Sequence, residues 1–378
     1  MGINLLNELI WDLDLGPVFP EKEDIKDLFY DAGLYPRDRE SHKGDYGKVL
    51  VVAGSEGMAG AAILAAKAAL RAGAGLCTVL AESATIPVIQ TAIPEATCIN
   101  RDDLLLDMDP LMPEGMESPY DYFMESINNY RAIVFGPGLG MGPDMVKFID
   151  DICYHFTGTL VLDADGINTV SQYSELLFSI EAARCSIVIT PHAGEAERLM
   201  EACEFNQANS LSSLIDEVED YPEDQELEDN RDSRMMLMRE AYEREGAFKE
   251  ITEEAMDRMD TAVELALRLR TPGSSEKSMV AAVVKGANTA IAVNDGRLQY
   301  FFNTTGNPGM ATGGSGDTLS GIIGGLAAQG MTAGEAAIAG VYLHGLAGDL
   351  AARELSQFSL MAGDISNYLG KAYLSLFA

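Results

Sequence analysis

The sequence is short of positive charge: its 378 residues include 26 Lys and Arg against 59 Asp and Glu, for a net charge of -33. Nucleic acids and anionic membranes bind basic surfaces, so this balance argues against both kinds of partner. The excess acid is concentrated at residues 1–40, 102–125 and 201–260, which we interpret as solvated surface segments. The rest of the chain is nearly neutral, which leaves room for a ligand that carries phosphate.

The chain also lacks paired cysteines, a secretion signal and a long hydrophobic run. Its five cysteines are odd in number and form no Cys-X-X-Cys pair, as expected for reduced thiols in the cytoplasm. The N-terminus has no basic start and no small-residue cleavage site, so it does not resemble a signal peptide. The most apolar stretch, residues 318–334, is interrupted by glycines and is a poor candidate for a membrane span. We therefore expect a cytoplasmic protein that does not enter the membrane.

What the sequence does contain is an alternation of short apolar runs with helical patterns. An apolar run from Val49, a helix over 58–75 and a strand over 76–80 form a strand–helix–strand unit. The alternation continues with strands at 132–135, 159–162 and 186–189 and helices at 143–154, 174–183 and 194–202. This order predicts an α/β fold in which a mainly parallel central sheet is covered by helices on both faces.

The alternation lapses over residues 203–250, which are acidic and polar. We interpret them as an insertion, partly disordered or loosely helical. A helix over 252–270 and a strand over 281–284 follow, then a hairpin over 290–302 and two helices over 316–329 and 332–355. We therefore divide the chain into a polar helical arm at 1–40 and one domain at 41–378 that carries the acidic insertion at about 203–250.

The strongest chemical signal is the segment GNPGMATGGSGD at residues 306–317, which leads directly into a predicted helix. Glycines before a helix leave backbone N–H groups free to point at an anion, and the helix dipole adds partial positive charge. We assign Gly314, Ser315 and Gly316 to an anion hole. Asp317 would be the general base that takes the proton of a substrate hydroxyl as it attacks phosphorus. The alternative is that Asp317 only caps the helix.

Four further motifs follow predicted strands, at the sheet edge where open α/β proteins bind ligands. They are GPGLG at 136–140, DADGIN at 163–168, TPHAGE at 190–195 and KGANT at 285–289. GPGLG is either a ligand-binding loop or a simple strand-to-helix turn. In DADGIN, the polar residues either hold the waters of a metal, contact the substrate, or cap the next helix; they are Asp163, Asp165 and Asn168. His192 is a substrate contact or a structural histidine, and Lys285 is a phosphate contact or a solvated strand end.

The motif HKGDYG at residues 42–47 precedes the first strand. Its Lys43 and the neighbouring Lys48 supply counter-charges for phosphates, or the motif is an ordered surface turn. Together with the five motifs above, it completes a set of six that stand in the order found in the ADP/ATP-dependent NAD(P)H-hydrate dehydratase family, which the sequence resembles. The resemblance covers roughly residues 20–200 and 250–372 and implies a ribokinase-like fold.

The resemblance also implies a division of the site. Substrate contacts fall at Ala62, Gly138, His192 and the catalytic Asp317. The residues that it assigns to the adenine nucleotide are Lys285, Gly286, Ala287, Asn288, Thr289 and Gly316. Mg²⁺ is expected to bridge nucleotide oxygens, and no residue is assigned as its ligand.

The activity implied by the resemblance is repair of the S form of hydrated NADH or NADPH. Asp317 would deprotonate the hydroxyl at C6 of the nicotinamide ring, and that oxygen would attack the terminal phosphate of ADP or ATP. Phosphorylation converts hydroxide into a good leaving group, and its loss regenerates NAD(P)H. Bacterial-type family members are associated with ADP, which favours ADP here, although the residues leave the choice between ADP and ATP open.

Two other readings of the residues remain. One is a ribokinase-like kinase of a vitamin-precursor alcohol, a hydroxymethylpyrimidine or a thiazole, and the other is a non-catalytic nucleotide-binding protein. Many members of the resembled family carry an N-terminal epimerase domain, and the roughly forty residues ahead of HKGDYG are too few for one. The resemblance also implies a homo-oligomer, for which it suggests a tetramer. A separate epimerase partner and the role of the acidic insertion stay open.

Overall fold

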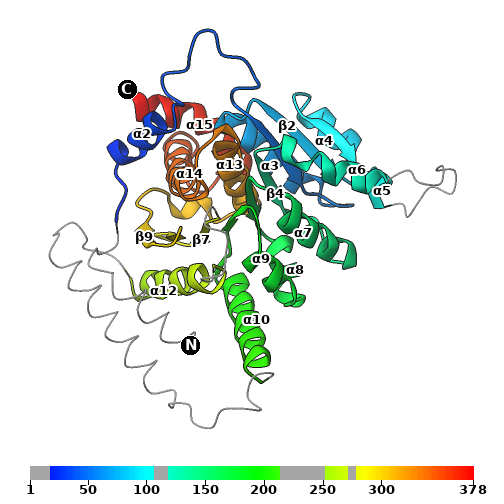
Figure 1. The fold of residues 1–378 in the computed structure, drawn as a ribbon. Helices are drawn as coiled ribbons and strands as arrows, with labels where there is room; N and C mark the ends of the chain where they lie inside the picture. The colour runs from blue at the N-terminus through cyan, green and yellow to red at the C-terminus, as the bar shows by residue number, and fades with distance from the viewer. Residues whose placement is uncertain (1–17, 106–117, 213–251, 271–277) are drawn as a thin grey trace.

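The computed structural model describes residues 18–105, 118–212, 252–270 and 278–378. Within them, the strands form one sheet in the order β3-β2-β1-β4-β5-β6-β7-β8-β9 (Figure 1). Strands β1 to β7 run parallel, and β8 and β9 complete the sheet as an antiparallel hairpin. The strands are β1 Lys48–Val52, β2 Leu76–Ala81, β3 Thr97–Asn100, β4 Ala132–Phe135, β5 Thr159–Leu162, β6 Ser186–Ile189, β7 Val280–Val284, β8 Ala290–Asn294 and β9 Leu298–Phe302.

Helices cover both faces of the sheet because its strands are apolar on both sides. Val49 and Val51 belong to one core, whereas Leu50 and Val52 of the same strand belong to the other. The first core is covered by α2 Lys22–Asp31, α3 Ala59–Ala72, α4 Ile86–Ala92, α13 Ser315–Gln329, α14 Ala333–Leu355 and α15 Ala362–Phe377. The second is covered by α5 Arg101–Leu105, α6 Pro119–Glu125, α7 Pro143–His155, α8 Asp165–Gln172, α9 Leu176–Glu181, α10 Ala193–Ser212 and α12 Glu253–Arg268.

Helices α3 and α13 pack with their backbones in close approach, which explains why both are rich in alanine and glycine. A Cβ added at Gly321 would lie 2.1 Å from the carbonyl oxygen of Ala65, and one at Gly325 would lie 2.5 Å from that of Ala69. Any side chain at either position would therefore separate the helices. This packing fixes the direction of α13 and thereby the place of its N-terminus.

The structure confirms the predicted α/β class, with a mainly parallel sheet covered on both faces. The elements that were not predicted are β3, α4, α5, α6, α8 and α15. Helix α10 continues to Ser212, so the first ten residues of the predicted insertion are helical, and 213–251 lie outside the described residues.

The predicted polar arm differs from expectation where it is described. Ile25 and Phe29 of α2 are buried in the main core, and the ring of Phe29 meets those of Tyr373 and Phe377 in α15 edge to face. This part of the arm is therefore held by apolar packing against the C-terminal helix. Residues 1–17 lie outside the described residues.

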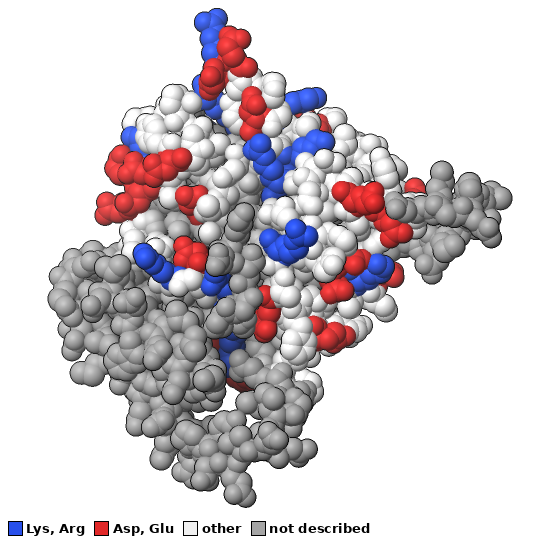
Figure 2. Space-filling view, in the orientation of Figure 1, with Lys and Arg blue, Asp and Glu red and all other residues white. Residues whose placement is uncertain are grey.

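The surface carries charges of both signs on the described part of the face shown in Figure 2. Lys and Arg side chains lie between acidic groups there, as expected if the excess acid belongs to particular segments. Among the described helices, none combines the length and the hydrophobicity that crossing a membrane requires.

Candidate active site

Five of the sequence motifs meet at one edge of the sheet. The parallel register pairs Val52 with Phe135, Phe135 with Leu162 and Leu162 with Ile189, so β1, β4, β5 and β6 end side by side. A backbone bridge between His192 and Lys285 joins the segments after β6 and β7. The carboxyl ends of these strands therefore carry the motifs to the edge where open α/β sheets bind ligands.

A buried ion pair forms the centre of this edge. Nζ of Lys285 lies 2.8 Å from Oδ1 of Asp163 and 3.7 Å from Oε2 of Glu195. Burial acts to lower the pKa of Lys285, but the attraction of the Asp163 and Glu195 carboxylates outweighs it and the pKa lies above its ordinary value. Lys285 is thus a fixed cation, which agrees with its predicted role as a phosphate contact.

Asp317 lies in the first turn of α13, beside this ion pair. A Cβ added at the preceding Gly316 would lie 3.1 Å from Nζ of Lys285 and 3.8 Å from Oδ2 of Asp163. Burial raises the pKa of Asp317 to about 6, and repulsion by Asp163 adds to this effect while the attraction of Lys285 opposes it. A carboxyl group with a pKa near the working pH is well suited to general-base catalysis.

The glycine loop before α13 leaves backbone donors free at the same place. Gly314 has a left-handed backbone with φ +87°, a conformation that turns the chain into the helix and favours glycine. The N–H of Ser315 donates to the carbonyl of Thr312 at 3.2 Å, so it is not a free anion-hole donor as predicted. Among the described residues, the N–H groups of Gly314, Gly316 and Asp317 have no recorded partner. The anion hole is therefore better assigned to these three.

His344 of α14 holds the end of this loop and was not predicted. Its Nε2 lies 3.0 Å from the carbonyl oxygen of Ser315 and 3.3 Å from the Ser315 hydroxyl. Burial lowers the pKa of His344 to about 4, so the imidazole is neutral at physiological pH and its Nε2–H donates to the carbonyl. In the sequence it was a single histidine within an apolar helix, a pattern that carries no distinguishing signal.

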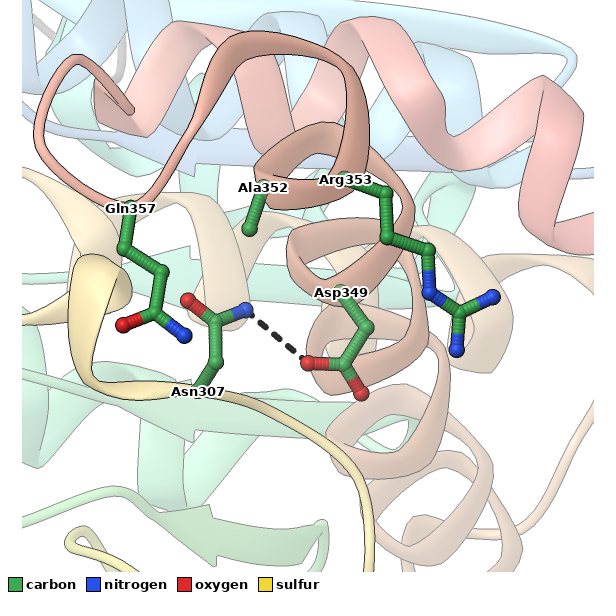
Figure 3. Close-up of a pocket in the computed structure, with 5 residues that line it drawn as sticks. All are labelled: Asn307, Asp349, Ala352, Arg353 and Gln357. Atoms are coloured by element: carbon green, nitrogen blue, oxygen red, sulfur yellow. Dashed lines mark hydrogen bonds between the residues drawn. The ribbon is translucent and has the colours of Figure 1, made fainter.

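The start of the loop is held by a second residue of α14. The Asp349 carboxylate accepts a hydrogen bond from the side-chain amide of Asn307 at 2.9 Å (Figure 3). It also accepts one from the N–H of Gly306 at 2.9 Å. These groups border a cavity of about 360 Å³ lined by Asn307, Asp349, Ala352, Arg353 and Gln357. Neither Asp317 nor Lys285 lines it, so it lies beside the loop rather than at the ion pair. Helix α14 thus anchors both ends of the glycine loop.

The loops after β1, β4 and β5 are tied together at the other side of the ion pair. The hydroxyl of Ser55 donates to the carbonyl of Gly138 at 2.9 Å, and the N–H of Gly140 donates to Asp165 at 2.8 Å. Gly138 has φ +57°, and a Cβ added there would lie 2.8 Å from that of Ala61. Ala62, predicted to contact substrate, is completely buried, so the exposed surface of this corner belongs to its neighbours, such as Met58.

His192 and the KGANT segment lie beside Lys285. Nδ1 of His192 accepts a hydrogen bond from the N–H of Gly194 at 3.1 Å, and 57% of its side chain is exposed. Thr289 closes the KGANT turn by donating to the carbonyl of Gly286 at 2.9 Å. Asn288 adopts a left-handed φ of +53° and its amide donates to the carbonyl of Asn303 at 3.3 Å. The predicted nucleotide contacts therefore form one folded loop that begins at Lys285.

Three of the polar residues singled out in the sequence have positions or partners that give them no role at the ion pair: Lys43, Lys48 and Asn168. HKGDYG precedes β1, and Gly47 packs against the carbonyl of Ala328 near the far end of α13. Helix α13 is about 20 Å long, so Lys43 and Lys48 lie at the opposite edge of the sheet from Asp317. Of the two alternatives for this motif, its position favours the ordered turn over counter-charges for phosphate at Asp317. Asn168 accepts from Arg198 at 2.8 Å, which indicates a structural role.

The fold and this edge define a class: a ribokinase-like α/β protein with a glycine anion loop and a carboxylate at a helix N-terminus. The ADP/ATP-dependent NAD(P)H-hydrate dehydratase from Bacillus subtilis has this fold, with TM-score 0.62 and 24% identity over 96% of this chain and 99% of that one. A ribokinase-like superfamily protein from Enterococcus faecalis matches with TM-score 0.61 and 21% identity over 95% of both chains. Residues 49–221 and 248–371 match the NAD(P)H-hydrate dehydratase family, and the chain belongs to this family.

Named relatives come in two lengths. The bifunctional NAD(P)H-hydrate repair enzyme Nnr of Moorella thermoacetica is 33% identical over 343 residues, which are 88% of this chain and 50% of that protein. The chain thus spans about half the length of the bifunctional relatives it matches. The ADP-dependent (S)-NAD(P)H-hydrate dehydratase of Listeria monocytogenes is 28% identical over 92% of this chain and 94% of that protein. Residues 222–247, which the family does not match, fall within the acidic insertion.

Proposed function

We propose that this protein dehydrates the S form of hydrated NADH or NADPH and couples the reaction to cleavage of ADP or ATP. The observation that carries the proposal is the group formed by Asp317, the Lys285–Asp163 ion pair and the free N–H groups at the start of α13. Phosphoryl transfer requires a base, a cation and donors for the phosphate oxygens at one place. The names of the relatives from Listeria monocytogenes and Bacillus subtilis support this choice of substrate.

Each group has a defined task in the transfer. Asp317 accepts the proton of the C6 hydroxyl as the hydroxyl oxygen forms a bond to the terminal phosphorus of the nucleotide. The bond from that phosphorus to the bridging oxygen breaks, and AMP leaves from ADP, or ADP from ATP. Lys285 and the N–H groups of Gly314 and Gly316 stabilise the negative charge on the transferred phosphoryl group.

The phosphorylated intermediate then eliminates phosphate. The lone pair of the ring nitrogen expels the C6 phosphate ester, and loss of a proton from C5 restores the ring double bond. Gly138 and Met58 lie together at the corner formed by the loops after β1 and β4, whereas His192 lies beside Lys285. We assign the nicotinamide ring to the corner of Gly138 and Met58, with His192 as a further contact. The exposed apolar side chain of Met58 at this corner suits a reduced, uncharged ring.

The residues present fit Mg²⁺ held jointly by protein and nucleotide. Oδ2 of Asp163 is buried and has no hydrogen-bond partner among the described residues, so a carboxylate oxygen faces the site unsatisfied. In the same residues, no group of three or more His, Cys, Asp or Glu side chains is arranged to hold a metal alone. We propose Asp163 as the protein contact, with the remaining ligands from phosphate and water. When bound, Mg²⁺ would neutralise charge on the phosphate oxygens.

The test is recovery of reduced-nicotinamide absorbance from hydrated NADPH, with Mg²⁺ and either ADP, ATP or no nucleotide. Recovery only with nucleotide supports the proposal and identifies the phosphate donor. Absence of recovery with both nucleotides, from folded protein, would contradict it and favour a kinase that acts on a small alcohol.

The homo-oligomer implied by the family resemblance also remains a proposal. Several apolar side chains beside α14 and α15 are exposed in the single chain, among them Phe358 and Met361. Exposed apolar groups of this kind are compatible with a subunit contact. Light scattering at several protein concentrations tests the point, and a monomeric mass throughout would contradict it.

A further inference from the structure

The KGANT loop has a neighbour that neither the motifs nor the comparisons single out. Arg258 of α12 extends across the loop, and its Nη2 donates a hydrogen bond to the carbonyl of Ala287. A Cβ added at Gly286 would lie 2.7 Å from Nε of Arg258 and 2.9 Å from its Cδ and Cζ. The guanidinium group therefore occupies the space that a side chain at position 286 would need.

The position of Arg258 is fixed by the packing of its helix. Ala255, Met256 and Met259 of α12 are buried in the core, and the helix packs against β7 and β8, the strands on either side of the loop. Arg258 itself is half-buried between this helix and the loop. The hydrogen bond from Arg258 to Ala287 thus ties the loop to a helix whose position is fixed by its packing in the core.

The hydrogen bonding of this guanidinium is incomplete. Nε of Arg258 is buried without a partner, and no ion pair joins Arg258 to another described residue. Two other arginines do form ion pairs: Arg101 lies 2.5 Å from Glu82, and Arg268 of the same helix lies 2.5 Å from Glu264. An arginine cannot lose its charge at physiological pH. Arg258 is therefore a cation that the Glu254 and Asp257 carboxylates attract but that forms no ion pair in the described residues, and its buried donor is set against the loop that we assign to an anionic nucleotide.

We infer that Arg258 is a positioning residue of the nucleotide site: it holds the KGANT loop through the Ala287 carbonyl and adds positive charge where the nucleotide binds. The inference rests on the proposed function for the identity of the ligand. The chemistry it predicts is that of a nucleoside di- or triphosphate rather than of the nicotinamide substrate. Loss of Arg258 should weaken nucleotide binding and leave the chemical step nearly unchanged.

The first experiment compares Arg258→Met with Arg268→Met as a matched control on the same helix. ADP binding is measured directly by calorimetry, and kcat and KM are measured in the recovery assay. Because a hydrogen bond to a charged group is involved, we expect Arg258→Met to raise the Kd and KM for ADP about tenfold. Its kcat and its KM for hydrated NADPH should stay within about twofold, and Arg258→Lys should recover part of the loss. Arg268→Met should bind ADP as the wild type does.

A second experiment uses the contact at Gly286. The three atoms nearest to an alanine Cβ there all belong to the side chain of Arg258, so Gly286→Ala should displace the guanidinium and weaken ADP binding. Because both changes remove the same interaction, the double variant Gly286→Ala/Arg258→Met should bind ADP no more weakly than Arg258→Met alone. Losses that multiply would show that the two residues act independently and would overturn the inference.

The remaining outcomes are also decisive. Unchanged ADP affinity in Arg258→Met, or a fall in thermal stability and kcat at unchanged ADP affinity, overturns the inference. ADP binding that depends on Arg258 in a protein that repairs no hydrated NADPH supports the inference and refutes the proposed function. Absence of any adenine-nucleotide binding by the wild-type protein overturns both.

Discussion

The two ends of helix α13 differ in whether folding satisfies their polar groups. At the C-terminal end, the buried amide of Gln329 donates to the carbonyls of Ala72 and Gly325 at 3.0 and 2.9 Å. At the N-terminal end, the N–H groups of Gly316 and Asp317 have no partner among the described residues, and a buried carboxylate oxygen of Asp163 is also unsatisfied. Folding completes the first end, whereas the second end needs a ligand.

The same comparison explains the placement of charge. The N-terminal end of α13 gathers Asp317, Asp163 and Glu195 around Lys285. Burial, together with repulsion by the other carboxylates, raises the pKa of Asp317 to about 6 against the attraction of Lys285. Such crowding costs stability and persists at sites where it serves catalysis. Changes at the N-terminal end should therefore affect turnover, whereas a change at the C-terminal end should affect only stability.

Asp317→Asn should produce the largest effect. The amide keeps the size of the side chain but cannot accept a proton, so kcat should fall about 10³-fold. ADP affinity should be nearly unchanged, as measured by calorimetry on the same preparation. Turnover at the wild-type rate would show that Asp317 is only a helix cap.

Lys285→Met should reduce both stability and nucleotide binding. It leaves the buried carboxylate of Asp163 without its cation, which should lower the free energy of unfolding by about 3–5 kcal/mol. Denaturant titration and ADP binding measure the two effects. The matched change Lys48→Met, at the opposite edge of the sheet, should alter neither ADP affinity nor kcat. A loss of ADP affinity in this variant would instead support Lys48 as a counter-charge for phosphate.

The pH dependence of activity should report the pKa of Asp317. As pH falls below about 6, the carboxylate is protonated and kcat/KM should decrease about tenfold per pH unit. The effect on stability has the opposite sign, because folding raises this pKa from 3.8. The ionised form destabilises the folded state above pH 6, and this penalty disappears as pH falls through 6 toward 4.

Asp317→Asn makes the stability part of that prediction measurable. At pH 8 the variant should be more stable than the wild type by on the order of 1–3 kcal/mol, and at pH 3 the two should be equal. Denaturant unfolding at both pH values is the measurement. A variant that is less stable at pH 8 would show that the carboxylate stabilises the fold.

His344→Phe should have a moderate effect on kcat. It removes the donor to the Ser315 carbonyl and loosens the end of the glycine loop, so we expect kcat to fall about tenfold. His344→Gln keeps an N–H donor and should retain most of the activity. Equal loss in both variants would point to packing of the imidazole rather than to its hydrogen bond.

Gln329→Leu should have the smallest effect and should affect only stability. Two hydrogen bonds to buried carbonyls are lost at the C-terminal end of α13, which should cost about 1–3 kcal/mol in the free energy of unfolding. The kcat of the folded variant should equal that of the wild type. A lower kcat would show that the two ends of the helix are not independent.

Much of the fold followed from local pattern. Strands β4, β5 and β6 were predicted with their observed bounds, because each contains three or four buried apolar or β-branched residues in a row and is followed by a loop motif. Strand β3, Thr97–Asn100, was missed because it is a short edge strand whose side chains are partly exposed. The burial of Ile25 and Phe29 was missed because it depends on α15, more than three hundred residues away.

Site residues could be predicted where they belong to a motif that follows a strand. Contacts between residues far apart in the sequence could not be predicted. Lys285 and Asp317 were assigned from their loops, but the Lys285–Asp163 pair joins residues 122 positions apart. The alternatives for Lys43 could have been narrowed from the sequence, because a motif that precedes a parallel strand lies at the edge opposite the ligand site. Arg258 and His344 carry no motif and became visible only through their contacts.

The central claim is that the N-terminal end of α13 couples nucleotide cleavage to dehydration. Its most direct test is to quantify AMP, phosphate and NADPH in one reaction that starts from ADP and hydrated NADPH. The account predicts equal amounts of all three products, and none of them when Asp317→Asn replaces the wild-type protein. NADPH formed without AMP, or AMP formed with a stable phosphorylated product and no NADPH, would contradict it.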